Sequence, residues 1–150
     1  MQRTDFGEMA CSIARTASVM GEPWTPLVLR NLYIGISRFD QLQASLGISR
    51  KVLAERLKWL TEQEVIERRE LADYPARHEY VLTGKGLDLF NVLMAMVAWG
   101  DKYQAGEAGP PVLYRHHACG QIAHAELACS HCNQPMSARN IDILPGPGSG

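Results

Sequence analysis

Two short motifs in the C-terminal part of the sequence carry residue types that bind transition metals. They are His116-x-x-Cys119 and Cys129-x-x-Cys132, with nine residues between Cys119 and Cys129. Zinc favours four sulfur or nitrogen ligands at such spacings, and a segment too short for its own core gains folding free energy from the metal. We therefore expect a structural Zn²⁺ held by His116, Cys119, Cys129 and Cys132. Four protein ligands close the coordination sphere, so no water-activating role is expected.

The nitrogen ligand of this expected zinc site is left open by the spacing. His117 and His131 compete with His116 for that position. The first motif has a histidine in place of one cysteine, so the pattern is less specific than a four-cysteine ribbon. The alternative is that the three cysteines of the two motifs are unligated thiols on an extended arm.

The fourth cysteine, Cys11, directly precedes a segment with the pattern of a helix, residues 12–20. A thiol near a helix N-terminus can have a lowered pKa, and Arg15 supplies a cation four residues further on. Cys11 is therefore a candidate redox sensor. The alternative is a small apolar residue buried at a dimer interface, a role that free cysteine often has.

The elements that must position these groups begin with two expected helices. The first covers residues 12–20, with Ser12 as its N-cap. The second covers residues 24–32, with Thr25 as N-cap and Pro26 at the first helical position, where proline costs no hydrogen bond. Gly21 and Pro23 separate the two helices.

Residues 39–63 predict two further amphipathic helices joined by a tight turn. Gly47 suits the left-handed position after the first of them, and Ser49 is a good N-cap for the second. The second helix has an apolar stripe at helical spacing, formed by Leu53, Leu57 and Leu60. A helix–turn–helix of this kind places its second helix in the DNA major groove.

A β-hairpin is expected after this helix pair. Residues 65–71 and 77–82 have strand-like patterns, and residues 72–76 have the composition of a turn. Arg68 and Arg69 lie on the first strand and Arg77 at the tip. A hairpin in this position is a wing, which can place cations on the DNA backbone beside the second helix.

A long helix is expected from residue 84 to residue 103. It has few polar positions, and a helix that is apolar on nearly all sides must be buried on more than one side. We expect the same helix of a second subunit to cover it, giving a homodimer. The alternative is that residues 105–150 fold back over it.

These elements define a domain organisation and a fold class. Residues 1–104 form a DNA-binding and dimerisation domain, residues 105–111 a linker, residues 112–144 a small Cys/His module and residues 145–150 a disordered end. The expected class is mainly α, of the α+β type. It is a winged helix-turn-helix with a two-stranded wing, a long C-terminal dimerisation helix and a small zinc-binding tail.

Composition and charge limit the classes of function. The 150 residues are 46% hydrophobic, with no apolar run near the ~20 residues of a membrane span and no secretory h-region, so we expect a cytoplasmic protein without membrane contact. The net charge is −1, but residues 38–58 contain five basic and two acidic residues, a local charge of +3. A local basic face is typical of nucleic-acid binding. No glycine-rich phosphate loop, paired carboxylates or nucleophile–base motif is evident, so no enzyme is expected.

Taken together, these segments resemble the HxlR family of bacterial transcription regulators, winged-helix proteins related to the MarR type. The resemblance covers about residues 10–103. The residues that carry it are Cys11, Trp24-Thr25, Arg38-Phe39, Leu53-x-Glu55-Arg56-Leu57, Tyr80-x-Leu82-Thr83-x-Lys85-Gly86 and Trp99-Gly100. It implies a homodimer on a palindromic operator, with half-sites about one helical turn (~34 Å) apart. Such a dimer represses or activates nearby genes; we expect a repressor, and the sequence leaves the sign of regulation open.

The resemblance also implies roles for individual residues. By match of position, the groove-facing set is Ser49, Arg50, Lys51, Ala54 and Glu55. The expected phosphate contacts are Arg38, Lys58, Arg68, Arg69 and Arg77. Several members of the family carry at the position of Cys11 a thiol that senses electrophiles or oxidants.

Two further interpretations remain at the level of the sequence. The first is a winged-helix module for protein–protein assembly, with a zinc-stabilised tail as the docking arm; the basic segment and the hairpin arginines favour DNA instead. The second concerns a small-molecule effector, for which Trp24, Phe90 and Met94 are candidate pocket residues. The same three residues can equally belong to the core.

Overall fold

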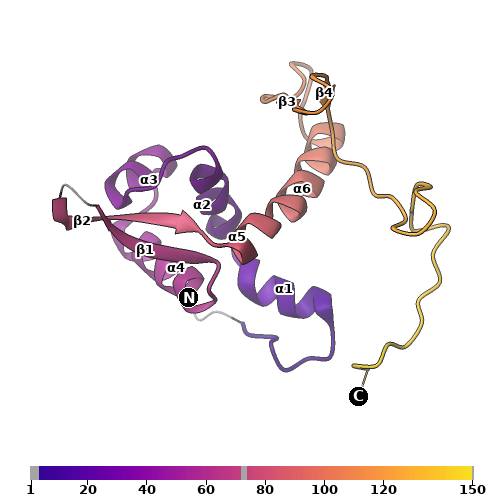
Figure 1. Ribbon diagram of the computed structural model, residues 1–150, viewed down its shortest axis with the longest axis horizontal. Coiled ribbons are helices and arrows are strands. Elements are labelled where there is room, and N and C mark those ends of the chain that lie inside the picture. The colour runs from indigo at the N-terminus through magenta and orange to yellow at the C-terminus, as the bar shows by residue number, and fades with distance from the viewer. Residues whose placement is uncertain (1–3, 72–73, 150) are drawn as a thin grey trace. The chain divides into compact units, whose positions relative to one another are not determined.

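The computed structural model describes residues 4–71 and 74–149. The chain forms two compact units, Met1–Leu89 with Pro147–Gly150, and Phe90–Gly146, which are described separately. The elements of the first unit are α1 (Ser12–Met20), α2 (Trp24–Tyr33), α3 (Phe39–Leu46), α4 (Arg50–Glu62), β1 (Ile66–Leu71), β2 (Tyr74–Leu82) and α5 (Gly84–Asp88) (Figure 1). The mainly α winged helix-turn-helix expected from the sequence is confirmed.

Helices α3 and α4 form the helix-turn-helix with the predicted turn chemistry. Gly47 ends α3 in the left-handed region (φ 67°), a conformation that glycine adopts without steric cost. The Ser49 hydroxyl caps α4 by accepting the backbone N–H of Val52 at 3.2 Å. The predicted stripe of α4 is buried in the core, which consists of Val28, Leu29, Leu32, Leu42, Ile48, Leu53, Leu57, Leu60, Val65 and Ile66. Burial of this stripe leaves the opposite face of α4 exposed.

The first two helices start differently from the prediction. Cys11, not Ser12, is the N-cap of α1, and its sulfur accepts the backbone N–H of Ala14 at 3.5 Å. Pro23 precedes α2 and already has helical dihedral angles (φ −60°, ψ −29°). The chain therefore enters the helix before Thr25, which is buried and donates its hydroxyl to Glu22 Oε1 at 2.7 Å instead of capping.

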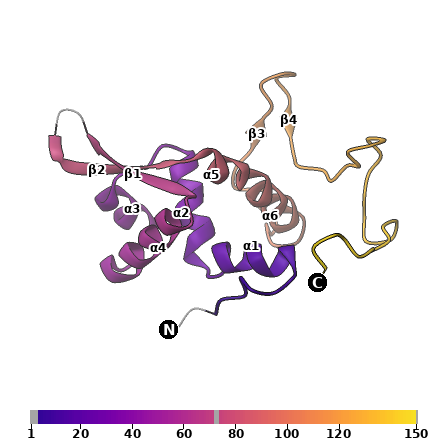
Figure 2. The same cartoon turned by 60° about the horizontal axis from the view of Figure 1, so that its bottom comes forward.

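Strands β1 and β2 form the antiparallel wing (Figure 2). Arg68 pairs with Tyr80, and the backbone N–H of Tyr80 donates to the Ser37 carbonyl at 2.8 Å, which ties the wing to the loop before α3. The predicted turn at residues 72–76 is wrong for residues 74–76, which belong to β2; Ala72 and Asp73 lie outside the described residues. The pairing register shifts between Glu70 and Leu71.

The wing returns to the helices at a tight junction around Thr83. Its hydroxyl donates to the Glu64 carbonyl at 2.6 Å and accepts the N–H of Gly86 at 3.1 Å, which caps α5. The Lys85 ammonium donates to the Gln63 carbonyl at 2.7 Å. Thr83, Lys85 and Gly86 thus join the end of α4 to the start of α5, which gives this sequence motif a structural role.

The second unit begins inside the segment predicted as one helix over residues 84–103. That segment is divided at Leu89 into α5 and α6 (Phe90–Tyr103). The Leu89 N–H bonds the Gly86 carbonyl three residues before it, and the Tyr33 hydroxyl donates to the same carbonyl. A tightened last turn of this kind interrupts the α-helical ladder.

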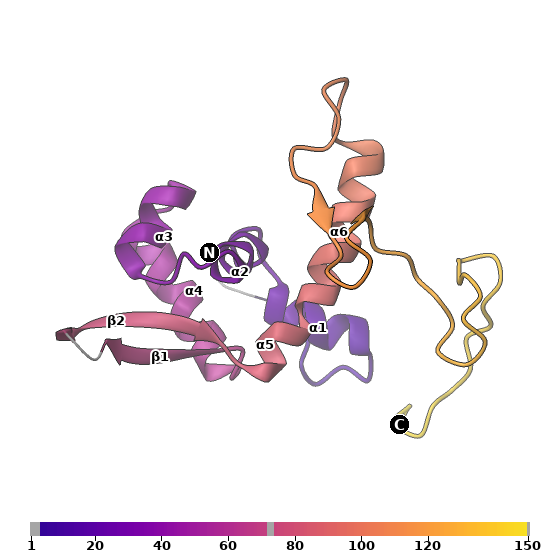
Figure 3. The same cartoon turned by 45° about the horizontal axis from the view of Figure 1, so that its top comes forward.

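After α6, the chain has little regular structure (Figure 3). Strands β3 (Tyr114–Arg115) and β4 (Ile122–Ala123) pair antiparallel, and an isolated bridge joins Ala128 to Pro135. The expected division into residues 1–104, 105–111, 112–144 and 145–150 stays a prediction. Within the described ranges, no helix has the length and apolar content that a membrane span requires.

Candidate nucleic-acid interface

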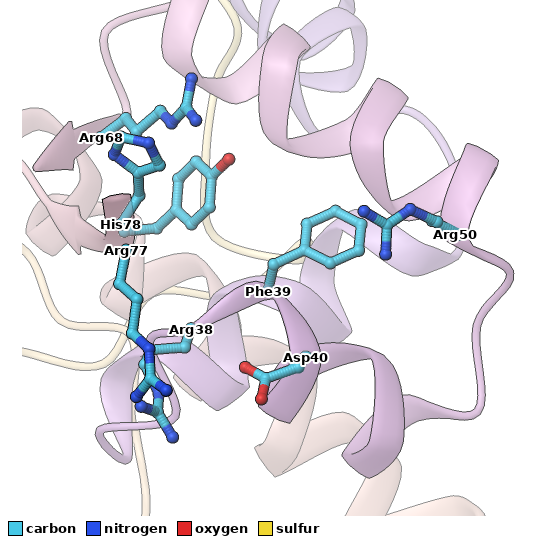
Figure 4. A pocket seen from close by; sticks show the side chains of 8 residues that line it. Arg38, Phe39, Asp40, Arg50, Arg68, Arg77 and His78 are labelled. Atoms are coloured by element: carbon cyan, nitrogen blue, oxygen red, sulfur yellow. The ribbon is translucent and has the colours of Figure 1, made fainter. Parts of the chain in front are cut away.

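An open groove of about 510 Å³ lies where the start of α3, the first turn of α4 and the wing meet. We call it the arginine groove. Its lining residues are Arg38, Phe39, Asp40, Arg50, Arg68, Arg77, His78 and Tyr80 (Figure 4). Four arginines and one aspartate give it a formal charge of 4 − 1 = +3 with the histidine neutral. Such a concentration of cations suits a polyanion.

The helix-turn-helix supplies the first part of the groove. Arg38 occupies the extended N-cap position of α3 (φ −96°, ψ 149°), directly after Ser37, which accepts the N–H of Tyr80. Arg50 is the first residue of α4, and its guanidinium lies 5.0 Å from the centre of the Phe39 ring. This cation–π contact orients an otherwise exposed arginine.

The wing supplies the second part through its strand alternation. Arg68 on β1 is opposite Tyr80 on β2, so both lie on the face that lines the groove. Arg69 points to the other face by the same alternation. There its guanidinium donates to the Glu67 carboxylate at 3.0 and 3.2 Å. The structure therefore brings Arg68 to the groove and leaves Arg69 outside it.

Four of the ten predicted DNA-binding residues meet in the groove: Arg38, Arg50, Arg68 and Arg77. The five other predicted residues of the helix-turn-helix, Ser49, Lys51, Ala54, Glu55 and Lys58, are exposed but do not line it. The Ser49 hydroxyl is engaged as the α4 cap, and Glu55 lies 3.8 Å from Arg56. These five positions present the outer face of α4, where a duplex could be read. Their individual roles stay predictions.

Sequence reasoning did not include four groove residues: Phe39, Asp40, His78 and Tyr80. The signal for His78 and Tyr80 was available, because period-2 alternation on β2 puts both on one face. Phe39 stands next to Arg38 in the motif quoted above. Its contact with Arg50 depends on how α3 and α4 pack, so local patterns could not predict it.

Cys11 is half-buried at the start of α1. The cation proposed to assist it, Arg15, donates its Nε to the Met9 carbonyl at 3.0 Å. This hydrogen bond engages the guanidinium with backbone rather than with the thiol. A sensing role for Cys11 stays a prediction.

The four predicted zinc ligands form two separate pairs. No cluster of three or more His, Cys, Asp or Glu residues suited to a metal occurs in the described part of the chain. Within the first pair, His116 Nδ1 lies 3.7 Å from Cys119 Sγ. In the second, backbone hydrogen bonds from Cys132 and then His131 hold the pKa of the Cys129 thiol below its ordinary value. Thiolate character at Cys129 is compatible with metal ligation.

The candidate effector residues lie in different units. Trp24 belongs to α2 of the first unit. Phe90 and Met94 of α6 line a depression of about 870 Å³ within the second unit, together with Tyr114 and residues 123–128. Trp24 is not among the residues that line this depression.

The part of the sequence that forms the helix-turn-helix and the wing is similar to known proteins. A sequence model of the family described as HxlR-like helix-turn-helix matches residues 19–108. The uncharacterized HTH-type transcriptional regulator Rv3095 of Mycobacterium tuberculosis is 43% identical over 137 residues, which are 91% of this chain and 87% of Rv3095. The HTH-type transcriptional regulator YodB of Bacillus subtilis is 37% identical over 100 residues, 65% of this chain and 89% of YodB.

The chain is also similar to solved structures of transcription regulators. The crystal structure of PA1607, described as a candidate transcription factor, has a TM-score of 0.86 and 28% identity, and covers 95% of this chain and 100% of PA1607. Reduced YodB has a TM-score of 0.55 and 38% identity, with 66% of this chain and 97% of YodB covered. YodB has also been solved after diamide treatment and with quinone bound.

Proposed function

The chain belongs to the HxlR-like helix-turn-helix family, and we propose that it represses transcription as a homodimer bound to a palindromic operator. Its relatives are transcriptional regulators of the helix-turn-helix type, so DNA is its partner. The observation that carries the proposal is the arginine groove. It concentrates four cations between the helix-turn-helix and the wing, on one side of a chain whose net charge is −1.

In this proposal, α4 enters the major groove and the arginine groove follows the adjacent backbone. Arg38, Arg68 and Arg77 neutralise phosphates, which fix the position of the protein without reading sequence. The first turns of α4 face the bases, where an arginine or lysine can pair with guanine N7 and O6. Ser49, Lys51, Ala54 and Glu55 are exposed there, and Lys58 extends the same face toward the backbone.

Dimerisation is supported by an uncovered apolar stripe on α6. Val92, Met96, Trp99 and Tyr103 follow one another at spacings of four, three and four residues, so they share one face of the helix. Each of these four side chains is exposed. The structure describes all of α6, and none of its residues is buried. Exposed apolar stripes of this length mark interaction surfaces. A second copy of α6 is the proposed occupant.

The test is selection of genomic DNA by the purified full chain, followed by sequencing of the bound fragments. We expect an enriched inverted repeat whose half-sites are centred about one helical turn apart and which binds two protomers. Affinity for it should fall steeply with salt. Absence of any enriched sequence, with binding insensitive to salt, would contradict a DNA-binding role.

Lys51→Ala is expected to weaken operator binding by about 1–3 kcal/mol and to affect random DNA much less. The reason is its position on the exposed face of the first turn of α4, outside the arginine groove. Fluorescence anisotropy with operator and scrambled duplexes measures both affinities. Equal weakening on the two duplexes would identify Lys51 as a phosphate contact rather than a base reader.

We further propose that the regulator responds to electrophiles or oxidants through Cys11. Two observations support this: the similarity to YodB, which has been solved in diamide-treated and quinone-bound forms, and the place of the Cys11 sulfur at the first turn of α1. Modification of the sulfur removes the acceptor for the Ala14 N–H. The depression lined by Phe90 and Met94 is the alternative place for a small-molecule effector.

Diamide treatment is expected to reduce operator binding of the natural chain at least 10-fold and to leave Cys11→Ser unchanged, because the variant lacks the thiol at the first turn of α1 and keeps the three tail cysteines. Gel shifts before and after treatment, with recovery by dithiothreitol, make the comparison. Because the serine variant keeps the three cysteines of the tail, it also distinguishes an effect of Cys11 from an effect of those cysteines. Full DNA binding by the treated natural chain would rule out this sensor.

A further inference from the structure

We propose that residues 114–136 fold around a single zinc ion held by His116, Cys119, Cys129 and Cys132. The inference goes beyond DNA binding and assigns the nitrogen ligand that sequence spacing leaves open. It rests on a repeated local structure. We call residues 116–121 the first knuckle and residues 129–134 the second knuckle.

The two knuckles have the same backbone hydrogen bonds. In the first, the His116 N–H donates to the Gln121 carbonyl at 2.9 Å, and the Gly120 N–H donates to the His116 carbonyl at 2.8 Å. In the second, the Cys129 N–H donates to the Gln134 carbonyl at 2.8 Å, and the Asn133 N–H donates to the Cys129 carbonyl at 2.9 Å. The two sets of bonds coincide after a shift of thirteen residues.

Backbone dihedral angles repeat with the same shift. Gly120 has φ 70° and Asn133 has φ 61°, so the residue after the second ligand of each knuckle is left-handed. Asparagine is among the non-glycine residues that most readily adopt this conformation. The turn thereby returns the chain after presenting two side chains from its tip.

The flanking strands also repeat. Arg115 pairs with Ile122 across the first knuckle, and Ala128 pairs with Pro135 across the second. In both cases the paired residues stand one before the first ligand and six after it. Each knuckle is therefore the tip of a miniature hairpin, with two potential ligands on the tip.

This register selects the nitrogen ligand. The shift of thirteen residues aligns His116 with Cys129 and Cys119 with Cys132. It aligns His117 with Ser130, and His131 with Ala118, neither of which can hold zinc through a thiolate or imidazole. His116 thus occupies the ligand position, and His117 and His131 occupy positions between ligands.

The distance between the two ligand atoms of the first knuckle fits zinc. Bond lengths of about 2.3 Å to sulfur and 2.0–2.1 Å to nitrogen, at a tetrahedral angle, separate the two ligand atoms by about 3.6 Å. His116 Nδ1 and Cys119 Sγ are 3.7 Å apart. The N–H of His131 donates to Cys129 Sγ at 3.4 Å, which leaves that sulfur oriented and supported by the backbone.

The tail from residue 112 to residue 149 has no buried core that could hold the knuckles together. No residue from 112 to 149 is buried, while Leu113, Ile122 and Leu127 are more than half exposed. The seven residues from 122 to 128 connect the knuckles, a length that allows one to fold back on the other. A donor set of three thiolates and one imidazole selects zinc over the oxygen-seeking cations.

The test is metal analysis of the full chain, purified without chelators in a phosphine reductant. We expect one zinc per chain by mass spectrometry of the metal. After chelator treatment, titration with Co²⁺ should give the absorption bands of a tetrahedral site with thiolate charge transfer, saturating at one equivalent. His116→Ala and Cys132→Ser should lose the metal and the bands.

Matched variants decide the ligand set. His117→Ala, His131→Ala and Cys11→Ser should each keep one zinc per chain, and His116→Cys should restore binding with a stronger thiolate charge-transfer band. A natural chain that contains no zinc and gives no Co²⁺ spectrum would overturn the proposal. Loss of metal in His131→Ala or His117→Ala, with retention in His116→Ala, would overturn the assignment by register.

Discussion

Simultaneous replacement of Arg38 and Arg68 by alanine should weaken operator binding about 100-fold for each protomer bound. A hydrogen bond to a charged group contributes at least about 1.5 kcal/mol, and each 1.4 kcal/mol corresponds to a factor of ten. Arg38 stands at the N-cap of α3 and Arg68 on the inner face of the wing, so the pair spans the arginine groove. Neither residue is in the core, and the fold should be retained.

The dependence of affinity on salt provides a second readout for this double variant. Loss of two phosphate contacts should lower the slope of log affinity against log salt by about 1.8 for each protomer. Operator and random DNA should be affected alike, since phosphate contacts carry no sequence information. An unchanged slope would show that these two arginines do not contact phosphates.

Arg69→Ala is the matched control for this experiment. It removes the same charge one residue away, but from the opposite face of the wing, where Arg69 is held by Glu67 at 3.0 Å. Affinity should change less than about threefold, because an exposed ion pair contributes little and the groove is left intact. A loss equal to that of Arg68→Ala alone would contradict the division of the wing into two faces.

Gly86→Ala should lower the free energy of unfolding by about 3 kcal/mol and Tm by about 6–12 °C. A Cβ atom at this position would lie 2.1 Å from the Val65 carbonyl oxygen and 3.1 Å from Leu82 Cδ2. The same carbonyl accepts the N–H of Thr83 at 3.1 Å, so the backbone cannot move without loss of that bond. Thermal unfolding followed by circular dichroism measures the shift.

Gly84→Ala, in the same helix, is the control for propensity. No atom lies within 4 Å of the Cβ that this change would add. Alanine should therefore be neutral or stabilise by up to about 1 kcal/mol, because it restricts the unfolded chain. Equal Tm values for the two variants would mean that the contact with Val65 is relieved at no cost.

Much of the fold follows from short stretches of sequence. Gly47 and Ser49 mark the end of α3 and the start of α4, since a left-handed residue and an N-cap act on their own neighbours. The apolar stripe of α4 and the two-stranded wing were predicted for the same reason. One error was local, since Cys11 rather than Ser12 caps α1 through the N–H of Ala14. The other occurred where a neighbouring element intervened: the helix from residue 84 is interrupted at Leu89, next to the Gly86 carbonyl that the Tyr33 hydroxyl contacts.

The residues that make up the candidate site were harder to predict from the sequence. Sequence alone marked Arg68 and Arg69 as equivalent, and only the pairing of β1 with β2 separates them, because strand register decides which face each side chain occupies. Phe39 joined the site only through the packing of α3 against α4, which brings its ring under Arg50.

The sequence by itself determined the helix-turn-helix, the wing and the two knuckles, because caps, turns and periodicity depend on residues close in the chain. Tertiary structure decided which cations share the arginine groove. That choice depends on contacts between segments distant in sequence, such as the bond from Tyr80 to Ser37, which no local pattern encodes.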